Sequence, residues 1–419
     1  MSSWLAQTIN QAEQVNDWLS PKRRESLALL KETQWPNRKT EAWKYTPVNT
    51  IERANFAAHN DSQNAGFGSQ EIPGLNSIDL FFIDGVLDAQ ASTADLPAGL
   101  QITSLAAAQS SHWVLENFKR SKPDKHFFGL VNDALATQGC VIDVEQDTLI
   151  ERPIRIAQTF SLGSQSHTRV IMRLAKNAQA CVVEQLEGND LSLNTSFAEY
   201  QIADGAMLEH YRLAMQCNAA ISVGGCHFSL GNKSKLNSNL IGYGSQLSRV
   251  DMDIIHGGEH SNAKLNVIYL LDGKEVFDLH SSIEHTKPHG NSEQNVRCIV
   301  ADHANAIFNG RIHIHRDAQK ILAEMNNRNL LMSENAQINT KPELEIYADD
   351  VRCAHGATIA EINEDAMFYL QSRGISRADA QVLLSFGFIN ELVDLMNNSA
   401  VAEWLRPQLR QRFANMEIR

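Results

Sequence analysis

The sequence predicts a mainly β protein in which a parallel β-helix core lies between N-terminal and C-terminal α-helical segments. No proline occurs between Pro153 and Pro288, and proline is kept out of sheet interiors because it cannot donate a ladder hydrogen bond. Over the same region short alternating runs such as VIMRLA and LNVIYLL recur between small polar turns. A β-sandwich would show a similar pattern of short strands and polar turns. Turns with a single Asn or Asp, as at Asn177 and Asp204, favour the successive rungs of a β-helix.

The 419 residues suffice for two or three structural units at about 150 residues per domain. We predict an N-terminal helical and mixed region over 1–150, a parallel β-helix core over 151–359 and a C-terminal helical domain over 360–419.

The N-terminal region opens with helices. Ser20 followed by Pro21 predicts an N-cap and a first helical residue. Residues 78–86 (IDLFFIDGV) predict two strands joined by a turn at Asp84-Gly85. A further short helix is expected over 104–120.

The C-terminal segment returns to helix. Ser376 and Asp379 form a capping box with Asp in place of Glu, and Gly374 stands where a preceding helix would end. A final basic helix contains Trp404. These helices either cover the open end of the coil or dock another protein.

The composition excludes several classes of function. A net charge of −12 argues against nucleic-acid binding, which needs a basic surface. No run approaches the ~18 apolar residues that a membrane span needs, and the polar N-terminus is not a secretory signal. Six scattered cysteines without a C-x-x-C pair indicate a reducing, cytoplasmic location. The chain has no nucleotide-binding loop and no catalytic motif that would mark it as an enzyme.

Two histidine-containing segments stand out. His256-Gly-Gly-Glu-His260 matches a zinc-protease string, but glycines each cost about 1 kcal/mol in a helix, so we expect a turn. Arg311, His313 and His315 alternate with isoleucines on one strand and share a face. That face is either a solvated outer surface or a patch for a partner or substrate.

The segment from Asp349 to Gly356 (DDVRCAHG) is the strongest candidate for a site. In an extended strand Cys353 and His355 share a face at a spacing of ~7 Å. Thiolate and imidazole suit iron–sulfur clusters, iron or zinc, but two ligands cannot fill a tetrahedral shell. The pair is therefore either incidental or half of a site that another chain completes.

These residues resemble the SufB/SufD family of iron–sulfur cluster assembly proteins. The matching segments are FNGRI (308–312), DAQK (317–320), NRNLLMS (327–333), KPELEI (341–346), ADDVRCAHGATI (348–359) and FYLQSRGIS (368–376). RKTEAWKYTP (38–47), and the absence of any cysteine before Cys140, resemble the SufD branch.

The resemblance implies a right-handed β-helix in a non-enzymatic scaffold. The implied partners are a SufB-like paralogue, contacted through the β-helix, and a SufC-like ATPase, contacted through residues 364–419. His355 would be a ligand, and Cys353 a ligand or neighbour, of an iron–sulfur cluster held transiently at the subunit interface. The resemblance leaves open a homodimer of the isolated chain and binding of reduced flavin by the whole complex.

Two other functions remain as alternatives. A β-helix carbohydrate-active enzyme would need clustered carboxylates, whereas Asp349 and Asp350 are adjacent in sequence and point to opposite faces of a strand. A purely structural interaction protein would bury Cys353 as an inert thiol.

Overall fold

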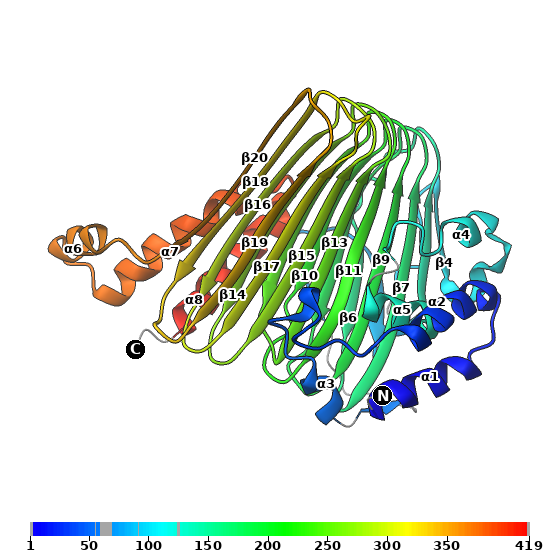
Figure 1. Cartoon of the computed structure of the whole chain (residues 1–419), viewed down its shortest axis with the longest axis horizontal. Helices are drawn as coiled ribbons and strands as arrows, with labels where there is room; N and C mark the ends of the chain where they lie inside the picture. Colours follow the sequence, from blue (N-terminus) through cyan, green and yellow to red (C-terminus); the bar gives the residue numbers. More distant parts are fainter. Residues whose placement is uncertain (1–2, 55, 59–68, 91, 124–125, 417–419) are drawn as a thin grey trace.

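The computed structural model describes residues 3–416 apart from 55, 59–68, 91 and 124–125. The chain winds into a long parallel β-solenoid with helices along its sides (Figure 1). Two sheets, each of ten strands, form the walls, and successive strands from β6 onward alternate between them. The prediction of a mainly β fold with a parallel β-helix core and flanking helices is confirmed.

Both sheets are described here in the order in which their strands neighbour one another. Sheet A contains β19 (Gln337–Ile346), β17 (Asn305–Ile314), β15 (Val276–His285), β13 (Leu247–His256), β11 (Ile221–Leu230), β9 (Leu193–Ile202), β7 (Ser164–Leu174), β5 (Gln138–Val144) and β4 (Leu100–Ser104), with β1 (Ala57–Ala58) beside β7. Sheet B contains β20 (Val351–Ala360), β18 (Ile321–Leu331), β16 (Asn291–Val300), β14 (Asn262–Leu271), β12 (Lys235–Tyr243), β10 (Met207–Ala214), β8 (Gln179–Glu187), β6 (Ile154–Thr159), β2 (Ile78–Ile83) and β3 (Val86–Asp88). The strand pairs are parallel except β2–β3 and β4–β5.

The turns between strands repeat with the coil. Side chains that touch across neighbouring rungs are 26 to 34 residues apart in sequence, which explains the uneven spacing of the turn motifs. Asn177 (φ 59°) and Asp302 (φ 53°) adopt the left-handed conformation expected of such turns. Lys233 and His260 do the same, so rung geometry imposes this conformation on other residue types too.

The interior of the coil is a column of inward-facing apolar side chains. Tyr200 stacks on Phe228, and Tyr269 stacks on Phe277, each at a ring-centroid distance of 5.0 Å. Because alternate residues of a strand face inward, each strand contributes several such side chains, and each buried large apolar side chain contributes roughly 1.5–3 kcal/mol. The core therefore runs the length of the solenoid.

The N-terminal helices lie along sheet A and the first rungs. They are α1 (Ser3–Gln14), α2 (Ser20–Glu32), η1 (Glu41–Trp43), α3 (Asn49–Arg53), η2 (Leu105–Ser110), α4 (His112–Asn117) and α5 (Phe127–Leu135). Leu19, not Ser20, is the N-cap residue of α2, because the Ser20 hydroxyl accepts a hydrogen bond from the Asp17 backbone N–H outside the helix. The β2–β3 hairpin turns at Asp84 and Gly85 as predicted, both with positive φ.

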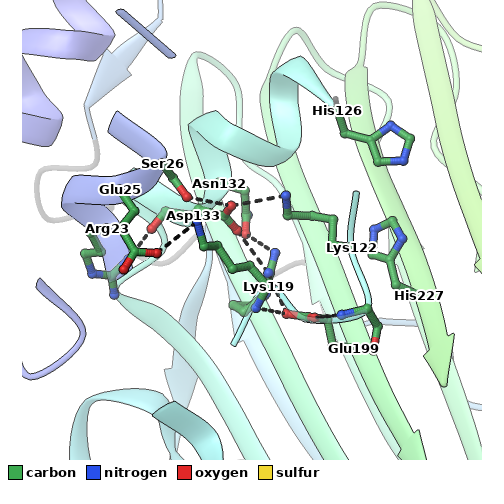
Figure 2. A network of polar contacts seen from close by, with 12 residues as sticks. Arg23, Glu25, Ser26, Lys119, Lys122, His126, Asn132, Asp133, Glu199 and His227 are labelled. Atoms are coloured by element: carbon green, nitrogen blue, oxygen red, sulfur yellow. Dashed lines mark hydrogen bonds and ion pairs between the residues drawn. The ribbon is translucent and has the colours of Figure 1, made fainter. Parts of the chain in front are cut away.

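A buried polar network fastens α5 to sheet A (Figure 2). Asp133 of α5 forms ion pairs with Lys122 at 3.1 Å and with Arg169 of β7 at 3.0 Å, and Arg169 also contacts Glu199 of β9 at 2.7 Å. Burial alone would raise the pKa of Asp133, but Lys122 and Arg169 reverse this effect and lower it. The network pairs two cations with two carboxylates and is balanced in charge.

The C-terminal helices are α6 (Glu364–Ser372), α7 (Arg377–Val393) and α8 (Ser399–Asn415). The Ser376 hydroxyl caps α7 by accepting from the Asp379 N–H at 3.1 Å, and Gly374 follows α6 at φ +85°, both as predicted. Apolar residues of α7 and α8, such as Ile389 and Leu405, pack against the outer face of sheet B. The idea that these helices cover the end of the coil is wrong, since β20 remains exposed.

The division at residues 150 and 360 stays a prediction. Strand pairing already includes β2 and β5, which precede residue 151. Within the described part of the chain, no helix combines the length and the apolar character needed to cross a lipid bilayer.

Candidate functional site

The last rung of the solenoid places the predicted pair at an open end. β20 pairs with β18 in parallel, so that Cys353 lies beside Ala323 and His355 beside Met325. Ala323 is 0% and Met325 2% exposed, which places Cys353 and His355 on the inward-facing column of the coil. Among the described residues no further strand covers the outer edges of β19 and β20.

The two side chains differ in exposure. Cys353 is half-buried and packs against the interior apolar cluster, whereas His355 is exposed. No described side chain donates to or accepts from the His355 imidazole. Partial burial raises the pKa of the Cys353 thiol, so a metal that bound it would have to displace a proton. The structure thus brings an accessible imidazole and a neighbouring thiol to the uncovered end.

The turn before β20 fixes the position of this strand. The Lys320 N–H donates to the Asp350 carbonyl, and the Asp350 N–H donates to the Gln319 side chain at 2.8 Å. Lys320 takes a positive φ of 58° to make this contact. Asp349 and Asp350 thus belong to a turn, and the strand itself begins at Val351.

A second exposed apolar surface lies on α6 and α7. Phe368 is 73%, Tyr369 58% and Leu383 48% exposed. α6 extends away from the solenoid (Figure 1), and Met367 is its buried side chain. Aromatic side chains exposed together on a protruding helix are typical of a protein-binding surface.

The other histidine motifs lie in the turns and on the side wall of the coil. His256 and His260 lie at the end of β13 and in the following turn, and they stack on His285 and His289 of the next rung at 4.1 and 4.4 Å. The expectation of a turn is confirmed. Arg311, His313 and His315 share the outer face of sheet A while Ile312 and Ile314 face inward, as predicted.

Reasoning from sequence missed a polar cluster inside the coil. Glu184 accepts hydrogen bonds from Tyr200, from His210 and, at 2.6 Å, from Arg212, and Cys226 lies beside the same carboxylate. Burial alone would raise the pKa of Glu184, but Arg212 and His210 lower it to about 2. The rung spacing of 28 residues between Glu184 and Arg212 is the signal that would have revealed it. Arg212 neutralises the Glu184 carboxylate inside the coil, so this buried cluster does not need a further cation.

The fold and the open rung define a class: a β-solenoid scaffold whose end presents metal-binding side chains and unpaired strand edges. Comparison with known proteins places the chain within that class. Residues 156–388 match the SUF system FeS cluster assembly SufBD core domain, and residues 5–156 match the SufBD N-terminal region. The chain belongs to the SufBD family of iron–sulfur cluster assembly proteins.

Relatives support this assignment over nearly the whole chain. An iron–sulfur cluster assembly SufBD family protein of Synechocystis is 29% identical over 89% of this chain and 86% of its own length. The iron–sulfur cluster assembly protein SufD of Escherichia coli is 28% identical over 94% of this chain and 93% of its own. The chloroplastic protein ABCI7 of Arabidopsis thaliana is 26% identical over 94% and 88%.

Proposed function

We propose that this chain is a non-catalytic scaffold subunit that builds and transfers iron–sulfur clusters together with a SufB-like paralogue and a SufC-like ATPase. The exposed last rung carries the proposal. Within the described residues, no further rung follows its inward-facing side chains, among them Cys353 and His355. A second solenoid stacked on this end would cover the apolar interior, pair the strand edges and supply further ligands.

In this proposal His355 is a ligand of a cluster held transiently and shared with the SufB-like subunit, and Cys353 is a second ligand or its neighbour. The SufC-like ATPase binds residues 364–419, where Phe368 and Tyr369 are exposed, and supplies the energy. In the absence of the paralogue, the same strand edge would pair with a second copy of the chain. A cytoplasmic location and reduced flavin in the whole complex belong to the same proposal.

Co-purification with the two partners tests the proposed surfaces separately. Ala357→Lys places a charge on the inward face of the last rung, beside His355, whereas Ala354→Lys places it on the outward face beside exposed Glu324. We expect Ala357→Lys to abolish capture of the SufB-like subunit and Ala354→Lys to preserve it. Equal capture by both variants would contradict pairing through the end of the coil.

A second pair of variants tests the exposed surface of α6. Phe368 and Leu162 are both 73% exposed, and Leu162 lies in a turn between β6 and β7. We expect Phe368→Ser to lose the SufC-like ATPase and Leu162→Ser to retain it. If Phe368→Ser left capture unchanged, the docking site would lie elsewhere.

Thiol labelling separates the scaffold from a purely structural protein. In the scaffold, Cys353 should react in the isolated chain and be protected in the complex with the SufB-like subunit. A thiol that is equally unreactive in both states would favour the structural alternative.

A further inference from the structure

A second group of metal-binding side chains lies far from the last rung, between sheet A and the N-terminal region. Atoms of His126, His227 and Asp253 lie within 4.8 Å of one another. His227 of β11 is directly beside Asp253 of β13 in the parallel register, and both project from the outer face of the sheet. His126, the residue before α5, approaches from the N-terminal side, and its ring centroid is 5.6 Å from that of His227 (Figure 2).

The donor atoms converge on one carboxylate oxygen. His126 Nε2 and His227 Nδ1 each lie 2.8 Å from Asp253 Oδ2. A small movement that opens these contacts would let the same three atoms surround an ion at the ~2.0–2.2 Å distances of zinc–imidazole and zinc–carboxylate bonds. Two imidazoles and one carboxylate, with positions left for water, form a recurrent ligand set for iron(II) and zinc.

A second carboxylate lies behind one of the imidazoles. Asp251 Oδ2 lies 3.6 Å from His126 Nδ1, the ring nitrogen that points away from Asp253. A carboxylate behind a ligating histidine fixes the ring and its tautomer. The group therefore has an outer contact of the kind found around bound metals.

Several buried carboxylates surround the group. Asp251, Asp253 and Asp278 are all buried, and Arg249 forms ion pairs with Asp251 at 3.1 Å and with Asp278 at 2.9 Å. Arg249 thus pairs with two of these three carboxylates, and Asp278 also contacts His280 at 3.0 Å. The neighbouring Lys122, Asp133, Arg169 and Glu199 network is balanced within itself. A divalent cation held by Asp253 and the two imidazoles would therefore be a favourable counter-charge for the buried carboxylates.

The group also has access to solvent and room for water. A cavity of about 270 Å³ is lined by His126, Asp253 and His280, and by Trp43 and Glu41 of η1. This volume is many times the ~30 Å³ that a water molecule occupies in the liquid.

We infer that His126, His227 and Asp253 form a binding site for a first-row divalent cation, of the iron(II) or zinc class, with the remaining positions open to the cavity. The ion would join the start of α5 to two rungs of sheet A. This site is independent of the cluster site proposed on β20 and would exist in the isolated chain.

Cobalt(II) is a suitable probe because its visible d–d absorption reports geometry and stoichiometry. Every sample carries Cys353→Ala and His355→Ala, so that β20 cannot contribute ligands. We expect one equivalent of cobalt(II), displaced by zinc. His126→Gln and the isosteric Asp253→Asn should weaken binding at least ~100-fold. Asp251→Asn, which removes the contact behind His126 together with the ion pair to Arg249, should weaken it ~10-fold.

His315→Gln is the control, because His315 lies on the same face of sheet A and is accessible, at 43% side-chain exposure. Its cobalt affinity should equal that of the parent. X-ray absorption of the zinc-loaded parent adds a measurement that does not depend on the folding of a variant: it should show imidazole scattering and no sulfur ligand. Absence of stoichiometric binding, unchanged affinity in both ligand variants, or a zinc–sulfur shell would overturn the inference.

Discussion

The two ends of the solenoid differ in how far the rest of the chain covers them. At the first end, antiparallel β3 and β4 flank β2 and β5, and η2 and α4 pack against the outer face of the nearby strands. Inward residues there, such as Phe82 and Ile142, are at most 2% exposed. At the last end, β19 and β20 leave their outer edges unpaired within the described structure, and most of β20 is exposed.

The difference shows that the chain covers its own strand edges at the first end and leaves them available to another chain at the last. Unpaired edges are a liability that proteins usually cover or blunt with charge, and this chain does cover its first end. The last rung instead carries small residues, Ala354, Gly356 and Ala357, around His355. Substitutions should therefore cost stability at the covered end and association at the open one.

The largest expected effect is at the covered end. Among the described residues, Arg169→Leu leaves Glu199 with backbone partners only, and Asp133 with one cation instead of two. Because an unpaired buried carboxylate loses its solvation, we expect the free energy of unfolding to fall by about 3–5 kcal/mol, measured by urea denaturation.

Arg377→Leu is the matched control. Its ion pair with Glu364 is exposed at both side chains, 58% and 73%, and such pairs contribute about 0–1 kcal/mol. An equally small loss for Arg169→Leu would show that the N-terminal helices do not depend on this network.

Acid should act next, on rungs that have neighbouring rungs on both sides. Burial lowers the pKa of His285 to about 4, and that of His256, stacked on it, well below its usual value. The unfolded chain therefore takes up these protons first, and stability falls as the pH drops from about 6.5 towards 4. For His285 the loss amounts to about 3 kcal/mol over the whole window.

Urea denaturation at pH values between 7 and 5 measures this slope before carboxylates such as Glu184 contribute. His285→Asn should flatten it, whereas His355→Ala, at the exposed end, should leave it unchanged. A slope that is the same in all three proteins would mean that other groups bind the protons.

The sequence predicted the solenoid well because its signals are local. Proline exclusion, period-two alternation and the capping box at Ser376 each depend on neighbouring residues. The exposure of His355 was not a local property, since it depends on which rung is last and on where α7 and α8 pack. The same limit hid the groups around Glu184 and Asp253: their members lie a rung apart, and His126 joins from a different region altogether.

The smallest effect on stability should come from the residue proposed to matter most for assembly. His355 is exposed and has no side-chain partner in the described structure, so His355→Ala should change the free energy of unfolding by no more than about 0.5 kcal/mol. Iron and acid-labile sulfide, measured after anaerobic purification with the SufB-like and SufC-like partners, should nevertheless fall. His315→Ala, also accessible but on the side wall, should retain both. A His355→Ala complex with full cluster content would mean that the end of the coil binds its partner without contributing a ligand, and a globally unfolded variant would mean that the last rung is part of the core.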